Sequence, residues 1–121
     1  MSTTKELGDR GEALVAEYLR AHSYEIAASQ FRCRFGEIDL IAKQDKTYVF
    51  IEVKYRTSPA AGDPAGAVDR KKQKKISKTA DYYRVLRRLP SDQPFRFDVV
   101  AETPGKIRVY TNAFYYQGSG W

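Results

Sequence analysis

Three residues near the middle of the chain have types and a spacing that suit the binding of a divalent cation. Asp39 lies in the run GEIDLIA, and Glu52 and Lys54 follow in the run FIEVKYR. If these runs are antiparallel strands joined by a short turn, the three side chains share one face, because successive side chains of a strand point to opposite faces. Opposed or diagonal positions on neighbouring strands lie about 5 to 8 Å apart, close enough for Asp39 and Glu52 to share one cation.

Two carboxylates at this distance would repel each other. At about 5 Å and an effective dielectric constant of about 20, the repulsion is about 3 kcal/mol, whereas one favourable cross-strand pair contributes about 0.2 to 1 kcal/mol. A positive group is therefore expected between them, either Lys54 or a hard cation with oxygen ligands such as Mg²⁺. The plainer interpretation is a solvated sheet face on which Glu52 or Glu37 pairs loosely with Lys54, and the spacing alone is compatible with both.

A hairpin over residues 36–56 would position these side chains. Its turn falls in the polar link from Lys43 to Lys46. Alternation gives the hairpin one wholly apolar face that is fit to cover a core. The members of that face are Ile38, Leu40, Ala42, Val49, Ile51 and Val53. The opposite face is mixed, because it adds Ile41, Tyr48 and Phe50 to the charged residues.

A first helix is expected from Lys5 to His22, after a capping box formed by Thr3 and Glu6. Its apolar stripe consists of Leu7, Gly11, Leu14, Val15, Tyr18 and Leu19. Glu12 lies at the border of this stripe and has no basic residue three or four positions away. It could therefore point along the buried seam, although a glutamate on the helix surface is the simpler interpretation.

A second helix, expected from Ala65 or Val68 to Leu89, contains the densest positive charge. Residues 68–89 include nine Lys or Arg against two Asp, a net +7 in a chain whose total is +6. Such a density is typical of a polyanion partner, although a solvated helix surface is the alternative. The cations nearest the start of the helix are Arg70, Lys71, Lys72, Lys74, Lys75 and Lys78.

Gln73 lies three residues before Ile76, in line with the inner stripe of this helix, and is expected to face inward. The stripe consists of Ile76, Thr79, Ala80, Tyr83 and Leu86. An inward amide has either a hydrogen-bonding task or the role of filling the end of the stripe.

Shorter elements complete the chain. Strands are expected over residues 24–31, 95–101 and 106–111, the last two joined through Pro104-Gly105. The run TSPAAGDPAGA (57–67) indicates a mobile loop at the border of the acidic residues. The aromatic tail NAFYYQGSGW (112–121) is expected to pack on the sheet, with base stacking or contact with a second subunit as alternatives.

The whole chain limits the class of protein. Its 121 residues, 42% of them hydrophobic, predict one domain over residues 1–121. No run approaches the about 18 apolar residues of a membrane span, and the start MSTTKELGDRGE has no signal-peptide core, so we expect a cytoplasmic protein with no membrane partner. One Cys (Cys33) and one His (His22) exclude an internal disulfide and a zinc site of the usual kind.

Several of these motifs together resemble the YraN-like family of bacterial proteins, over nearly the whole chain. They are Gly11-Glu12, GEIDLIA, FIEVKYR, Lys72-Gln73 and RFDVV. That family is similar in fold to the PD-(D/E)xK nucleases, including archaeal-type Holliday junction resolvases. The resemblance implies an α/β fold with a restriction-endonuclease-like αβββαβ core, in which helices flank a mixed sheet. Three positions depart from the pattern: Ile38 stands where the motif has Pro, Gln30 replaces an Asn, and Ser23 replaces a Gly.

The resemblance also implies a nuclease that uses Mg²⁺ or Mn²⁺ to hydrolyse phosphodiester bonds of DNA, including branched DNA. Asp39 and Glu52 would be its metal-binding carboxylates, and Lys54 the motif's lysine. Glu12 would help to hold the metal, and Gln73 would be the polar residue of the following helix. The alternative is a nucleic-acid-binding module that retains the fold without cutting. A junction-cutting enzyme would need two sites, and hence a homodimer.

Overall fold

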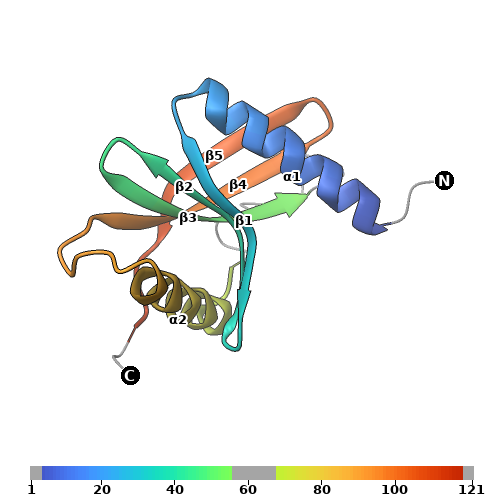
Figure 1. Cartoon of the computed structure of the whole chain (residues 1–121). Coiled ribbons are helices and arrows are strands. Elements are labelled where there is room, and N and C mark those ends of the chain that lie inside the picture. Colours follow the sequence, from blue (N-terminus) through green and yellow to red (C-terminus); the bar gives the residue numbers. More distant parts are fainter. Residues whose placement is uncertain (1–3, 56–67, 119–121) are drawn as a thin grey trace.

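The computed structural model describes residues 4–55 and 68–118, with side chains described from residue 11 onward. Its elements follow the chain as α1, three strands, α2 and two further strands (Figure 1). Their bounds are α1 Thr4–Ala21, β1 Glu25–Cys33, β2 Gly36–Gln44, β3 Thr47–Tyr55, α2 Arg70–Leu86, β4 Phe95–Thr103 and β5 Lys106–Phe114. This order contains the expected αβββαβ core and adds one final strand.

The five strands form one mixed sheet in the order β1-β2-β3-β4-β5. Only β3 and β4 are parallel, and α2 connects them, because parallel strands need a long crossover. Figure 1 shows α1 and α2 on opposite faces of the sheet. Both faces are therefore covered, and the predicted α/β class is confirmed.

Each helix covers its own apolar cluster. The cluster under α1 contains five of the six residues expected on the apolar face of the hairpin: Leu40, Ala42, Val49, Ile51 and Val53. Ile38 was expected with them but joins the cluster under α2. The pairing of β1 with β2 passes from Ser29–Leu40 to Phe31–Ile38, and between these pairs Gln30 has a φ of 49°. Ile38 lies beyond the last pair of β2 with β3, Leu40–Ile51, so the alternation that holds within the hairpin ladder does not carry through to it.

The mixed face of the hairpin is covered by α2, so its interpretation as a solvated surface is wrong. Ile41 and Phe50 are 0% and 1% exposed on this side. The ring of Tyr83 in α2 meets Phe50 edge-on, with 6.0 Å between ring centroids. Sequence alternation identified the two faces of the hairpin, but a single hairpin does not reveal that a distant helix covers the second one.

The second helix is shorter than expected. Asp69 caps its start, because its side chain accepts a hydrogen bond from the Lys72 N–H at 2.8 Å. Its end comes three residues before Leu89, where Arg88 adopts a φ of 54° and the Leu89 N–H donates to the Arg84 carbonyl. Leu86, expected on the inner stripe, is therefore the last helical residue and is exposed. Leu14 of α1 is exposed as well, contrary to its place in the predicted stripe.

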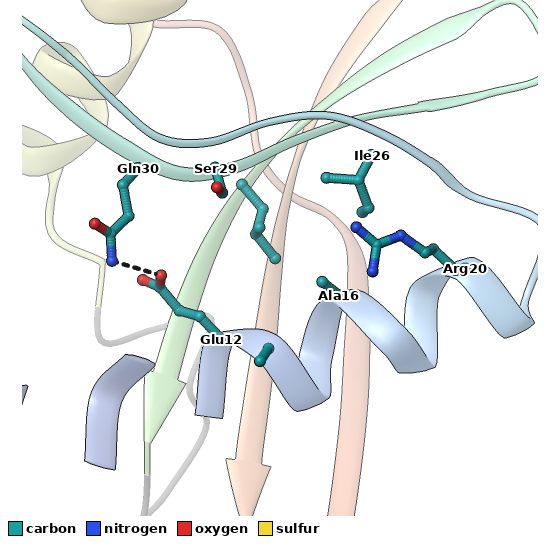
Figure 2. A pocket seen from close by; sticks show the side chains of 8 residues that line it. Glu12, Ala16, Arg20, Ile26, Ser29 and Gln30 are labelled. Carbon is teal, nitrogen blue, oxygen red and sulfur yellow. Dashed lines mark hydrogen bonds between the residues drawn. The ribbon is translucent and has the colours of Figure 1, made fainter. Parts of the chain in front are cut away.

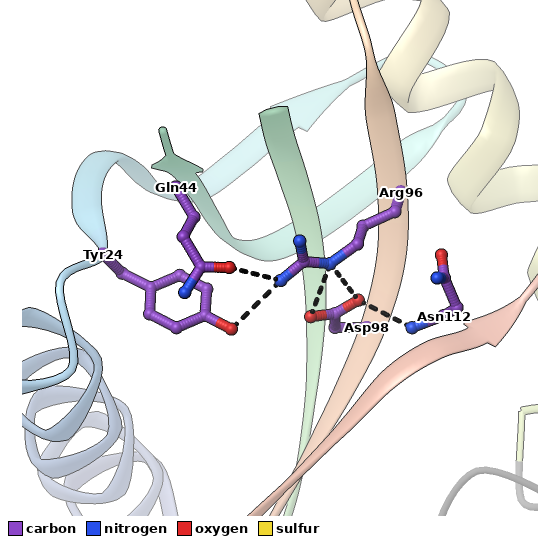
Figure 3. Close-up of polar contacts among 5 residues, drawn as sticks. All are labelled: Tyr24, Gln44, Arg96, Asp98 and Asn112. Atoms are coloured by element: carbon purple, nitrogen blue, oxygen red, sulfur yellow. Dashed lines mark hydrogen bonds and ion pairs between the residues drawn. The ribbon is translucent and has the colours of Figure 1, made fainter. Parts of the chain in front are cut away.

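An ion pair with a buried carboxylate ties three strands, β2, β4 and β5, to the segment before β1, at the edge where β3 and β4 begin (Figure 3). Arg96 Nε donates to both carboxylate oxygens of Asp98, at 3.1 and 3.2 Å, and Asp98 is fully buried. The Arg96 guanidinium also donates to the Tyr24 hydroxyl and to Gln44 Oε1, while Asp98 accepts from the Asn112 N–H. The charged residues of the RFDVV run therefore hold the sheet together, a role that alternation in one strand could not predict.

The aromatic tail packs on the protein in part, as far as residue 118, because Tyr115 is 81% exposed. Phe114 is buried and stacks on Phe97, with ring centroids 5.0 Å apart. The Tyr116 hydroxyl donates to Asp81 Oδ2 at 2.6 Å. Trp121, the predicted loop at 57–67 and the Thr3–Glu6 capping box lie outside the residues or side chains that are described. Within the described chain, neither helix is long and apolar enough to cross a membrane.

Candidate active site

Asp39 lies where the pairing of β2 with β3 ends. The register of the two strands runs from Gln44–Thr47 to Leu40–Ile51. At the residue before Leu40, the Asp39 carboxylate takes the place of a backbone acceptor, because its Oδ2 accepts a hydrogen bond from the Val53 N–H at 2.8 Å. This bond fixes the orientation of the Asp39 carboxylate next to Glu52, the neighbour of Val53 in β3.

Glu52 is an almost buried acid, with 9% of the residue exposed. The pKa of its carboxyl group is raised from an ordinary 4.5 to about 7, chiefly by burial and also by the neighbouring Asp39 charge. Lys72 and Lys54 act against this shift by favouring the charged form. The structure thus brings Asp39, Glu52 and Lys54 together, as the spacing of the hairpin predicted.

Lys72 is the positive group closest to the buried acid in the part of the chain that is described. Its Nζ lies 3.9 Å from Glu52 Oε2, the one ion pair that Glu52 forms there. We predicted Lys72 as one of a row of outward cations, but only 44% of its side chain is exposed. A signal for this position was present in the sequence, because Lys72 precedes Ile76 by four residues and Tyr83 by eleven, which places it on the inner stripe.

Gln73 is half-buried and has a hydrogen-bonding task. Its Nε2 donates to the Val68 carbonyl at 2.8 Å, which anchors the segment that leads into α2. The first turn of α2 is the part that brings Lys72 to Glu52. The described contact therefore supports the position of the helix, and direct participation of Gln73 in chemistry stays a prediction.

Glu12 projects from α1 toward Gln30 of β1. Its Oε2 accepts a hydrogen bond from Gln30 Nε2 at 2.8 Å, across a pocket of about 430 Å³ (Figure 2). The pocket is also lined by Ala16, Arg20, Ile26, Ser29 and Leu40. Over the described residues, no three His, Cys, Asp or Glu side chains gather in a way that could hold a metal ion. A contact of Glu12 with a metal through water stays a prediction.

The Asp39–Glu52 pair fits a hard divalent cation by the chemistry of its donors. Carboxylate oxygens are the ligands that Mg²⁺ prefers in proteins, and Mn²⁺ suits the same donors. The raised pKa of Glu52 indicates that burial beside Asp39 makes its charged form costly. A divalent cation would offset that cost more completely than an ammonium group at 3.9 Å.

Five of the six predicted nucleic-acid-binding cations are exposed on α2 and its start. They are Arg70, Lys71, Lys74, Lys75 and Lys78. Within residues 11–55 and 68–118, none of the five forms an ion pair, because the acids of α2 have other partners. Asp69 caps the helix and Asp81 binds Arg84. The positive charge of this surface is therefore not neutralised by described neighbours.

Comparison with known proteins gives one family. A model of the Uncharacterised protein family UPF0102 matches residues 11–101. A UPF0102 protein of Lachnoclostridium phytofermentans is 45% identical over 108 residues, which are 89% of this chain and 92% of that protein. One from Thermodesulfovibrio yellowstonii is 44% identical over 110 residues, covering 91% of this chain and 96% of its own length. One from Caldicellulosiruptor bescii is 48% identical over 96 residues, or 79% and 81% of the two chains.

The raised pKa of Glu52 predicts a pH dependence of stability in metal-free protein. Because the folded state binds this proton more tightly than the unfolded chain, the native state is favoured at low pH and loses stability as pH rises from about 4.5 through 7. The full shift corresponds to about 3 kcal/mol. We expect Glu52→Gln to abolish this loss, as measured by urea unfolding in EDTA at about pH 5 and about pH 8.

Glu37→Gln is the matched control, because that carboxylate is half-exposed and pairs with Arg32 at the surface. It should leave the pH profile of the wild type unchanged. Parallel pH profiles for the wild type and Glu52→Gln would show that Glu52 carries no such charge penalty.

Proposed function

Because the chain belongs to the Uncharacterised protein family UPF0102, the YraN-like family indicated by its motifs, we propose that it is a metal-dependent nuclease that hydrolyses phosphodiester bonds of DNA. The observation that carries this proposal is the pairing of the buried Glu52 with Asp39, beside Lys54 and Lys72. Charged groups that are costly to bury and gathered in one place are more typical of active sites than of structural surfaces.

We assign each residue a role that suits its position. Asp39 and Glu52 would hold Mg²⁺ or Mn²⁺, which supplies Lewis-acid polarisation of the scissile phosphate when bound. The Val53 N–H keeps the Asp39 carboxylate oriented for this task. Lys54 would orient the attacking water or stabilise the negative charge that develops on the phosphate. Lys72, already beside Glu52, would be free to pair with a phosphate once the carboxylates are neutralised.

The exposed cations of α2 would hold the DNA backbone. Contacts with phosphates carry no sequence information, so we expect recognition of DNA shape or branching rather than of bases. Cleavage of a symmetric branched substrate would require two sites, and therefore a homodimer.

A non-catalytic nucleic-acid-binding module is the second candidate. The exposed cations favour it, because they would bind a polyanion whether or not a metal is held. That function gives no reason to bury Glu52 beside Asp39, where the pair costs free energy. The two candidates therefore differ in whether the carboxylates are needed.

Cleavage assays separate the two candidates. A labelled panel of single strand, duplex, flap and four-way junction DNA would be incubated with Mg²⁺ or Mn²⁺, with EDTA as the metal-free control. We expect metal-dependent cutting that Asp39→Asn reduces by at least about a hundredfold, since metal catalysis lowers the barrier by several kcal/mol. DNA binding by the variant should be intact or tighter, because a negative charge near the phosphate is lost. Salt-sensitive binding without cutting of any substrate would favour the binding module.

The salt dependence of DNA binding tests the basic surface. If five cations contact duplex phosphates, the slope of log K against log salt should be about −4.5, and the triple change of Lys71, Lys74 and Lys75 to Ala should bring it to about −1.8. A control with the same loss of charge changes Lys46, Lys106 and Arg108, which are exposed away from α2, in the β2–β3 turn and in β5. Equal slopes for the two triple variants would place the contact surface elsewhere.

A further inference from the structure

We propose that the tip of the β1–β2 hairpin and the adjacent side of α2 form a binding track for single-stranded DNA. In this track, unpaired bases stack on Phe35 and Tyr82, and the backbone follows the lysines of α2 toward Glu52. The inference rests on the proposed nuclease function and names its substrate: DNA with an unpaired segment next to the scissile bond.

Two aromatic rings lie together at this place with cations beside them. The ring centroids of Phe35 and Tyr82 are 6.4 Å apart, and Tyr82 is 40% exposed. The Arg34 guanidinium lies 4.9 Å from the centroid of the Phe35 ring, and Lys78 Nζ lies 6.0 Å from it. Aromatic rings combined with cations are the arrangement that binds single-stranded nucleic acid, because the rings stack on bases while the cations contact phosphates.

The rings favour a single strand over a duplex for a geometric reason. In a duplex the flat faces of the bases are covered by their stacked neighbours, so a ring on a protein surface has no base face to contact. An unpaired base offers such a face, whatever its identity. The duplex would instead be held by the cations alone, which bind phosphates of either form.

Rigid elements hold the hairpin tip against the helix. At Gly36, which follows Phe35, a Cβ atom would lie 3.3 Å from Thr79 Oγ1 and 3.9 Å from Lys75 Cβ. The φ of Gly36 is 152°, so both its conformation and this close approach suit glycine. Figure 1 shows the tip of the hairpin reaching alongside α2. The rings therefore stand on a built surface rather than on a freely moving loop.

A line of residues connects the rings to the candidate active site. Lys72, Lys75, Lys78 and Tyr82 recur every three or four positions, so they follow one side of α2. At 1.5 Å per residue, the distance along the helix from Lys72 to Tyr82 is about 15 Å. Lys72 pairs with Glu52 at one end of this line, and Tyr82 adjoins Phe35 at the other.

The acids near the track are neutralised by other partners. Glu37 on the hairpin accepts from Arg32 Nε at 2.7 Å, so it leaves the charge of Arg34 available. Asp81, which precedes Tyr82, is buried and binds Arg84 and the Tyr116 hydroxyl. Between the rings and Lys72, the surface that a DNA strand would meet is therefore positive.

Binding without metal tests the track separately from cleavage. Fluorescence anisotropy in EDTA would compare a labelled single-stranded oligonucleotide with a duplex of the same length. The double variant Phe35→Ala, Tyr82→Ala should bind the single strand at least about tenfold more weakly, while its affinity for the duplex changes less than about twofold. Tyr115→Ala is the control, since Tyr115 is 81% exposed and lies outside the track.

A second variant tests whether the alanine variant loses affinity only because packing at the hairpin tip is lost. The double variant Phe35→Tyr, Tyr82→Phe keeps both rings and should keep the affinity of the wild type for the single strand. If the alanine variant loses affinity for single strand and duplex equally, or if it loses none, the track is wrong. The outcomes also separate the two proposals: ring-dependent binding without metal-dependent cutting would refute only the nuclease, whereas ring-independent binding with metal-dependent cutting would refute only the track.

Discussion

The unfavourable burial of Glu52 beside Asp39 is the constraint to which the surrounding structure responds. A carboxylate with a pKa near 7 in an almost buried place is costly in its charged form, and two neighbouring carboxylates add repulsion to the loss of hydration. The first turn of α2 offsets part of this electrostatic cost, because it places the Lys72 ammonium 3.9 Å from Glu52. Gln73 and the Asp69 cap fix that turn, so local contacts that look structural serve the electrostatics of the acidic pair.

The regular pairing of the sheet is also interrupted beside Asp39. The β2–β3 ladder ends at Leu40–Ile51, and Asp39 then accepts the next available N–H with its side chain. On the other side of β2, Gln30 adopts a left-handed conformation and donates to Glu12. Where a strand loses backbone hydrogen bonds, its N–H and C=O groups need other partners. The side chains of Asp39 and Gln30 lie where the pairing and the pleat are irregular.

Much of this could be predicted from the sequence, because alternation within one hairpin is a local property. It placed Asp39, Glu52 and Lys54 together and assigned five of six apolar residues to the correct face. The failures concern contacts between distant elements: the cover that α2 gives to Ile41 and Phe50, the switch of Ile38, and the Arg96–Asp98 pair. Lys72 is an intermediate case: it was predicted to point outward with the other cations, although its spacing from Ile76 and Tyr83 matches the inner stripe.

The most direct test of this account is a calorimetric titration of Mn²⁺ into wild-type protein, Asp39→Asn and Glu52→Gln near pH 7. If the pair holds a divalent cation, the wild type should show saturable binding accompanied by proton release, because Glu52 is partly protonated before the ion arrives. Each single variant should lose that binding, while Glu37→Gln retains it. Equal Mn²⁺ affinity in the wild type and both variants would contradict the assignment of Asp39 and Glu52 as a metal site.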